Sequence, residues 1–128
     1  MGRERRTYRI IGARAEKLAL RYLLARGLVL LSRNFHYRGG EIDLVMLDDN
    51  CIAFVEVRFR ASSDFVAPHL TVDRHKQQRI LATAARFLAR NPRLSARTTR
   101  FDVVAVSGTA APEIRWLRDA FRPEDSSL

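Results

Sequence analysis

Apolar residues recur every three or four positions between residues 9 and 26, the spacing that places them on one side of a helix. Gly27 follows this stretch, where a left-handed residue commonly ends a helix. The pattern therefore predicts a first helix over residues 9–26. Its apolar positions are Ile11, Ala15, Leu18, Ala19, Tyr22 and Leu23.

A second helical pattern begins near residue 71 and ends at Asn91-Pro92, because proline disfavours the helical conformation in the residue before it. Thr71 is expected to cap this helix, and an acid, Asp73, falls in its first turn. The apolar positions of the second helix are Ile80, Leu81, Ala84, Phe87 and Leu88.

Short apolar runs bounded by turn residues predict strands at 28–31, 41–48, 51–59 and 101–106, with a candidate fifth at 114–117. The second and third strands form a hairpin and are therefore antiparallel. The helix between the third and fourth strands indicates a crossover connection. The sequence thus predicts an α/β fold with a mixed central sheet flanked by helices.

The chain contains no internal repeat and no linker long enough to divide it. Residues 60–70 have the composition of a loop. We expect one domain spanning residues 1–128, with a core over about 9–121 and flexible ends at 1–8 and 122–128.

Composition narrows the setting in which such a domain would work. A hydrophobic content of 47% supports a core. No apolar run approaches the roughly 20 residues that span a bilayer, and charges interrupt any candidate signal peptide. Cys51 is the only cysteine, which excludes an internal disulfide and a thiolate metal cluster. These features indicate a cytoplasmic protein.

The net charge of +9 comes almost entirely from arginine, with lysine only at Lys17 and Lys76. The planar guanidinium suits phosphate oxygens, so a nucleic-acid partner is one interpretation. A bias toward solvated arginine explains the charge equally well. Charge therefore motivates a polyanion partner without deciding it.

The chemistry is concentrated in the predicted hairpin. If its loop is the two residues 49–50, Asp48 faces Cys51, and counting outward sets Asp43 opposite Glu56. Opposed residues share a face of the sheet, with Cβ atoms about 4.5–5.5 Å apart. Two facing carboxylates repel unless a positive charge lies between them.

Both acids interrupt apolar runs, since Glu56 lies within residues 52–57 and Asp43 within 42–45. A desolvated acid must be paired, protonated or bound to metal, and Mg²⁺ would satisfy this pair. The alternative is a cross-strand charge lattice with Glu41 and Arg58, which face each other in the same count. Spacing alone leaves both interpretations open.

Two further charged residues bear on that choice. Glu16 lies beside the apolar stripe of the first helix, and Lys76 lies four residues before Ile80 on the inward side of the second helix. Each on its own is an ordinary boundary residue. Convergence of Glu16 and Lys76 on the carboxylate pair would favour a metal site.

Several blocks occur in a set order along the chain: Gly12 with Glu16, Arg33-Asn34, residues 40–45, residues 54–58, Lys76, residues 100–104, Trp116 and Ala120-Phe121. Together they closely resemble the YraN-type family, which looks like a branch of the restriction-endonuclease-like PD-(D/E)xK superfamily and is similar to archaeal Holliday-junction resolvases. The resemblance extends from about Gly12 to Phe121.

The resemblance implies an α-β-β-β-α-β core and a site for Mg²⁺ or Mn²⁺. Asp43, Glu56 and the backbone carbonyl of Val57 would bind the metal, with Glu16 as an outer or additional ligand. The implied reaction is phosphodiester hydrolysis by a metal-bound water, assisted by a cation at the third position of the ExK motif. That cation is Arg58 in this chain, which keeps its charge but cannot act as a base.

Lys76 would be able to take the place of the missing lysine from the second helix. Val66 is a second departure, at a position where similar sequences tend to have glycine. The function expected first is a metal-dependent nuclease acting on DNA, including branched or junction DNA. Alternatives are a nucleic-acid-binding protein that keeps the fold without cleavage, favoured by Arg58, and a protein that binds an acidic partner. A junction resolvase would need two active sites, hence a homodimer.

The remaining candidates have weaker signals. His36, His69 and His75 lack ligand spacing and are expected at the surface or in loops. Packing or structural roles are expected for Cys51, Asp102 and Trp116. Ser62, Ser63, Arg58 and Arg60 would meet a phosphate backbone or simply be solvated.

Overall fold

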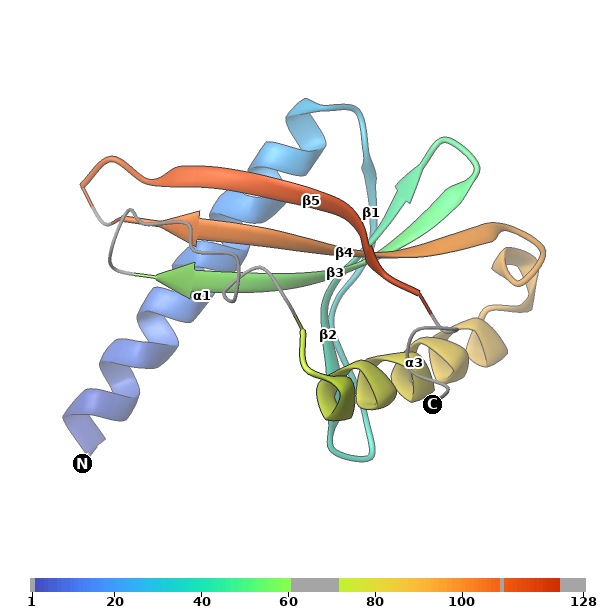
Figure 1. Ribbon diagram of the computed structural model, residues 1–128, viewed down its shortest axis with the longest axis horizontal. Coiled ribbons are helices and arrows are strands. Elements are labelled where there is room, and N and C mark those ends of the chain that lie inside the picture. The colour runs from blue at the N-terminus through green and yellow to red at the C-terminus, as the bar shows by residue number, and fades with distance from the viewer. Residues whose placement is uncertain (1, 61–71, 109, 123–128) are drawn as a thin grey trace.

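The computed structural model describes residues 2–60, 72–108 and 110–122, in the order helix, three strands, helix, two strands (Figure 1). The elements are α1 (Gly2–Ala25), β1 (Val29–Tyr37), β2 (Gly40–Asp48), β3 (Cys51–Arg60), α3 (Arg74–Arg90), the short 3₁₀ helix η1 (Pro92–Leu94), β4 (Thr98–Ser107) and β5 (Glu113–Phe121). This order confirms the predicted α/β class.

The five strands form one mixed sheet in the order β1-β2-β3-β4-β5. β3 and β4 are parallel, and every other neighbouring pair is antiparallel. The connection that makes β3 and β4 parallel passes through α3, as the predicted crossover requires. Strand β5 was the uncertain one in the sequence, and it forms a full edge strand of 9 residues.

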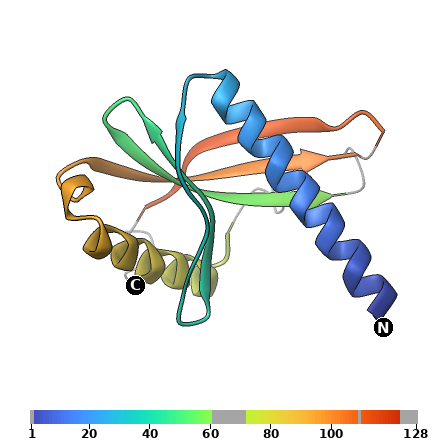
Figure 2. The same cartoon turned by 180° about the vertical axis from the view of Figure 1, so that it is seen from behind.

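α1 covers one face of the sheet and α3 covers the other (Figures 1 and 2). The core under α1 includes Ala15, Ala19, Leu23, Leu44, Met46, Val55 and Val104. The core under α3 includes Val45, Ile52, Phe54, Ile80, Ala84, Phe87, Phe101 and Val103. Helix-period residues on each helix and alternate residues on each strand therefore meet in two separate layers.

Some predicted boundaries were wrong. α1 begins at Gly2 instead of residue 9, since the charged residues before residue 9 carry no apolar stripe from which helix can be inferred. Gly27 ends this helix as expected, with φ +90°. Although α1 has 24 residues, none of the described helices is long and apolar enough to cross a membrane.

Two further boundaries differ from the predictions. β1 continues to Tyr37 instead of stopping at residue 31. The prediction missed this extension because β1 is an edge strand whose second half is largely polar. The N-cap of α3 is Asp73, whose Oδ1 accepts a hydrogen bond from the Lys76 amide at 2.9 Å. Thr71, the predicted cap, lies outside the described residues.

The β1–β2 turn packs directly against α3. Arg38 and Gly39 both have positive φ, +45° and +78°, which suits the tight turn of a two-residue hairpin. Gly40 is buried, and a Cβ at this position would collide with the hydroxyl of Thr83 on α3. Glycine here therefore allows the turn and the helix to approach closely.

β2 and β3 pair only along part of their length. The register runs from Asp48–Cys51 to Leu44–Val55, which confirms the predicted two-residue loop. Beyond Leu44–Val55 the strands separate (Figure 1). β2 also twists there, since Ile42 packs into the α3 core whereas Leu44 packs into the α1 core. Asp43 lies between them, at the point where the sheet opens.

Candidate metal centre

Asp43 is a half-buried acid with little to stabilise its charge. Its Oδ2 accepts a hydrogen bond from the Val57 amide at 2.7 Å, which is available because β2 and β3 have separated. Burial, the largest cause, acts together with the carboxylates of Glu56, Glu16 and Glu41 and raises the pKa of Asp43 to about 8, despite the lowering effect of the hydrogen bond from the Val57 amide. The site therefore disfavours a bare negative charge at Asp43.

Three carboxylates form the centre of this site. Oxygens of Glu16, Glu41 and Asp43 lie within 4.8 Å of one another, close enough to coordinate a single metal ion. The side-chain amide of Asn34 holds two of them, donating to Glu16 Oε1 at 2.9 Å and to Glu41 Oε1 at 3.1 Å. Asn34 has a φ of +51°, a conformation that asparagine tolerates better than most residues.

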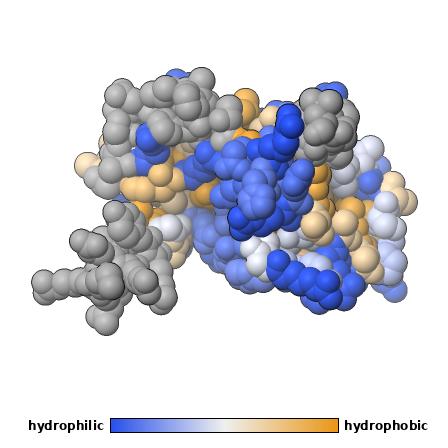
Figure 3. Space-filling view, turned by 60° about the horizontal axis from the view of Figure 1, so that its bottom comes forward, coloured by the Kyte–Doolittle hydropathy of each residue, from blue (hydrophilic) through white to orange (hydrophobic). Residues whose placement is uncertain are grey.

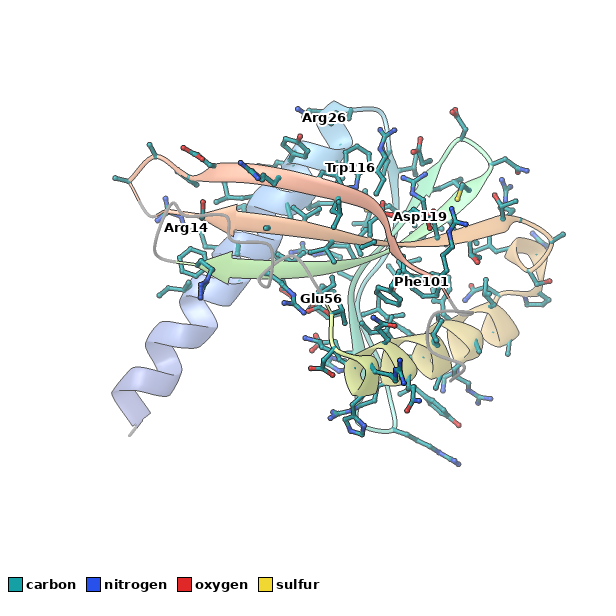
Figure 4. The ribbon with its side chains drawn as sticks, in the orientation of Figure 1. Arg14, Arg26, Glu56, Phe101, Trp116 and Asp119 are labelled. Carbon is teal, nitrogen blue, oxygen red and sulfur yellow. The ribbon has the colours of Figure 1, made fainter. Side chains whose placement is uncertain are left out.

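Glu56 faces the same opening from β3, between that strand and the first turn of α3 (Figure 4). Its side chain is only 10% exposed, and its Oε1 accepts a hydrogen bond from Lys76 Nζ at 3.0 Å. Asp73 fixes the start of α3 through the Lys76 amide. The N-terminal turn of α3 thus positions the Lys76 ammonium group next to Glu56.

The opening between β2 and β3 allows residues from both faces of the sheet to meet. Glu16 comes from α1 on one face, and Lys76 comes from α3 on the other. The group formed by Glu16, Glu41 and Asp43 therefore lies beside Glu56, which is paired with Lys76. Such an excess of negative charge in a partly desolvated place is the arrangement that a divalent cation stabilises.

A cleft of about 150 Å³ opens onto these groups. This volume is well below the roughly 300–1,000 Å³ typical of small-molecule pockets, so the cleft suits an ion and a phosphate group better than a whole nucleotide. It is lined by Gly39, Gly40, Glu41, Asp43, Glu56, Lys76, Arg79 and Ile80.

The structure brings together most of the residues that the sequence singled out. Glu16, Asp43, Glu56 and Lys76 converge, and Val57 joins them through its amide. Arg58 does not line the cleft among the described residues. It is half-buried, two positions beyond Glu56 on β3.

Sequence reasoning missed two members of the site. Glu41 was considered only as a partner of Arg58, but it belongs to the carboxylate group. Its position two residues before Asp43, on the same face of a regular strand, was the available signal. Asn34 gave no chemical signal beyond the family motif, because its role depends on the left-handed backbone of an edge strand.

The weaker candidates fall where they were expected or outside the described residues. His36 and His75 are exposed, and His36 Nε2 lies 3.7 Å from Glu41 Oε1. Cys51 is half-buried at the start of β3. The positions that lie outside the described residues are Ser62, Ser63, Val66 and His69.

Asp102 has the structural role that the sequence suggested. Its fully buried carboxylate accepts hydrogen bonds from Arg100 Nε at 3.1 Å, Trp116 Nε1 at 3.0 Å and the Asp119 amide at 2.9 Å. Arg100 also pairs with Asp48 at 2.9 Å. Trp116 and Asp119 both belong to β5 (Figure 4), so this network joins β4 to the edge strand.

Comparison with known sequences identifies the family. Residues 15–106 match the uncharacterised protein family UPF0102. The chain belongs to this family. The matched segment runs from the part of α1 that carries Glu16 to the penultimate residue of β4, and it contains all four carboxylates of the candidate centre and Lys76.

Curated relatives in the UPF0102 family are similar along nearly their whole length. A Coxiella burnetii protein is 43% identical over 114 residues, covering 89% of this chain and 93% of its own. The Saccharophagus degradans protein is 46% identical over 110 residues, covering 86% and 91%. The Nitrosococcus oceani protein is 45% identical over 119 residues, covering 92% and 96%. Family membership is thus confirmed.

Proposed function

We propose that this UPF0102 protein is a divalent-metal-dependent nuclease that hydrolyses DNA phosphodiester bonds. The observation that supports this most is the convergence of Glu16, Glu41, Asp43 and Glu56 beside a single lysine, with the pKa of Asp43 raised to about 8. A perturbed acid in an open cleft is typical of a functional site. The sequence resemblance to PD-(D/E)xK nucleases and junction resolvases supports the same reaction.

The donor set suits Mg²⁺ or Mn²⁺. It consists of carboxylate oxygens from Glu16, Glu41, Asp43 and Glu56, which hard cations prefer. The Val57 carbonyl is a further candidate ligand. Its amide points to Asp43, and the N–H and C=O of one strand residue point to the same side. A bound metal would polarise the phosphate and lower the pKa of an attacking water.

Lys76 supplies the lysine that the ExK motif lacks in this chain, where Arg58 takes its place. Its ammonium lies 3.0 Å from Glu56 and borders the cleft, where it would hold a phosphate oxygen and neutralise the charge that develops there. Unlike Arg58, a lysine can also transfer a proton. The placement of Lys76 therefore supports cleavage despite the arginine in the motif.

The test is a cleavage screen over single-stranded, duplex, flap and four-way DNA, with Mg²⁺ and with Mn²⁺. Wild-type protein is expected to cut at least one substrate with metal and none in EDTA. Asp43→Asn should lower the rate by about 10³-fold or more, since it removes a central ligand.

Asp49→Asn is the matched control for this screen. It makes the same chemical change on an exposed acid in the β2–β3 turn, where the positive φ of +51° tolerates asparagine. The control should cut like wild type. Equal cleavage by Asp43→Asn and Asp49→Asn would contradict the proposed site.

Binding without cleavage is the second candidate function, and Arg58 in the ExK position is the observation that favours it. In that case wild-type protein would bind DNA but cut none of the four substrates with either metal. A DNA affinity whose logarithm does not fall as the logarithm of the salt concentration rises would count against both nucleic-acid functions.

A further inference from the structure

Helix α3 carries a row of cations on the side that faces the β1–β2 turn. Arg79, Arg86 and Arg90 are spaced seven and four residues apart, with Thr83 between the first two, so all four lie on one side of the helix. The contact between Thr83 and Gly40 shows that this side faces the turn. The three arginines are exposed, and residues 74–90 contain no acid.

Three guanidinium groups of this region converge on one ring, that of Tyr37. Arg86 lies 5.0 Å from the ring centroid, Arg38 lies 5.3 Å from it, and Arg90 lies 6.0 Å from it. Arg90 also lies 5.7 Å from the centre of the Phe35 ring. Aromatic faces attract each guanidinium, but the guanidinium groups repel one another.

Within the part of the chain that the structure describes, no carboxylate pairs with the arginine cluster of Arg38, Arg86 and Arg90. Arg100 provides the contrast, since it is paired with two carboxylates. Three like charges held together around one ring, with no ion-pair partner among the described residues, indicate a surface for an anion with several charges.

The arginine cluster reaches the cleft beside the candidate metal centre. Arg79 and Gly39 line that cleft, and Arg38 is the turn residue directly before Gly39. From Lys76 to Arg90 the helix advances by about 21 Å, which corresponds to about six nucleotides of a duplex strand. Figure 3 shows hydrophilic side chains gathered on the face of the molecule that carries α3.

We propose that Arg79, Arg86 and Arg90, with Arg38 and Tyr37, bind the phosphate backbone of the DNA strand that enters the cleft. This proposal rests on the proposed nuclease function and adds the path of the substrate. The strand passes from the carboxylates along α3 toward its C-terminal end. Evenly spaced phosphates match cations distributed over this length, and the arginine fork fits phosphate oxygens.

The test measures binding of a fluorescent four-way DNA junction and a matched duplex by anisotropy in EDTA, at several salt concentrations. The double variant Arg86→Gln/Arg90→Gln should bind about tenfold or more weakly near 0.1 M salt. It should also reduce the slope of log affinity against log salt by about two, because each lost phosphate contact removes about 0.9.

The matched control is Arg21→Gln/Arg26→Gln on α1. It removes the same charge from exposed positions, and Arg26 also lies over an aromatic ring, 3.4 Å from the centre of Tyr22. Arg26 is remote from α3, at the end of the helix on the other face of the sheet (Figure 4). This control should leave the slope nearly unchanged. Equal losses in both variants would overturn the proposal.

Three further measurements keep the outcome clear. Thermal melts establish that the variants fold, and Arg86→Lys/Arg90→Lys should retain most of the salt slope, because it keeps the charges. Polyglutamate that competes with DNA at equal charge would overturn the assignment in favour of an acidic protein partner. If wild-type protein cuts DNA but Arg86→Gln/Arg90→Gln and Arg21→Gln/Arg26→Gln bind DNA equally well, the proposed DNA path is wrong while the nuclease function stands. If DNA binding depends on Arg86 and Arg90 but no substrate is cut, the DNA path stands while the nuclease function is wrong.

Discussion

Two acids on the central part of the sheet, Asp43 on β2 and Asp102 on β4, have opposite surroundings. Asp102 is fully buried, but donors from Arg100, Trp116 and the backbone of Asp119 surround its carboxylate. Asp43 is less buried and accepts a hydrogen bond only from the Val57 amide among the described residues.

The charges around the two acids differ in the same way. Arg100 provides a positive charge beside Asp102 and is itself paired with Asp48. Asp43 instead faces three other carboxylates, and Lys76, a cation that lines the same cleft, is paired with Glu56. Burial alone therefore does not identify a functional acid. The useful signal is a carboxylate whose charge the fold leaves unbalanced.

Removing the charge of Asp102 should have the largest effect on stability. Asp102→Asn leaves the Arg100 guanidinium with a weaker partner in a buried place, so the free energy of unfolding should fall by about 3–5 kcal/mol. Urea denaturation measures this change. Asp49→Asn is the control, since it alters an exposed acid in the β2–β3 turn and should change stability by less than about 1 kcal/mol. Similar losses in the two variants would refute a structural role for the buried network.

Adding a divalent metal should distinguish the two acids, because the ion is expected to bind at Asp43 and not at Asp102. With Mg²⁺ or Mn²⁺ in excess of its dissociation constant, wild-type protein should gain about 1–3 kcal/mol, because the ion binds the folded state only. A thermal shift of a few degrees would record this gain. Asp43→Asn should show little of it, whereas Asp49→Asn should respond like wild type. A metal shift that persists in Asp43→Asn would place the ion elsewhere.

The fold was largely predictable, because both helices and the hairpin follow from local patterns. The apolar stripe of α3 and the turn at residues 48–50 act over a few residues, and the structure confirms both. The edge strands were harder. β1 extends through polar residues that pair with β2, and such pairing leaves no periodic signal in the strand itself.

The site was predictable only in part, for a similar reason. Counting along the hairpin brought Asp43 toward Glu56, and the register follows that count up to the last pair before them. Counting did not show that the strands then separate. That separation admits Glu16 and Lys76 from opposite faces, and it depends on how both helices pack. The contacts of Asn34 with Glu16 and Glu41 depend on the left-handed backbone conformation of Asn34 itself, which strand propensity does not predict.

The smallest expected effect is a dependence of stability on pH that arises from Asp43 and its neighbouring carboxylates. Burial and the neighbouring carboxylates raise the pKa of Asp43 from 3.8 in the unfolded chain to about 8 in the folded protein. Between these values the folded state binds more protons than the unfolded state, so stability falls as pH rises. Without metal, wild-type protein should thus lose about 1–2 kcal/mol relative to Asp43→Asn between pH 5 and 9, as expected for a partly hydrated group.

Urea midpoints in EDTA across this pH range measure the difference. Asp43→Asn imitates the protonated acid, so it should be the more stable protein at pH 9 and nearly equal to wild type at pH 4. Asp49→Asn should follow the wild-type curve, because its acid is exposed. Parallel curves for wild type and Asp43→Asn would mean that Asp43 carries no strained charge. In that case the contrast with Asp102 would reduce to a difference in burial, and the main physical support for a metal centre would be lost.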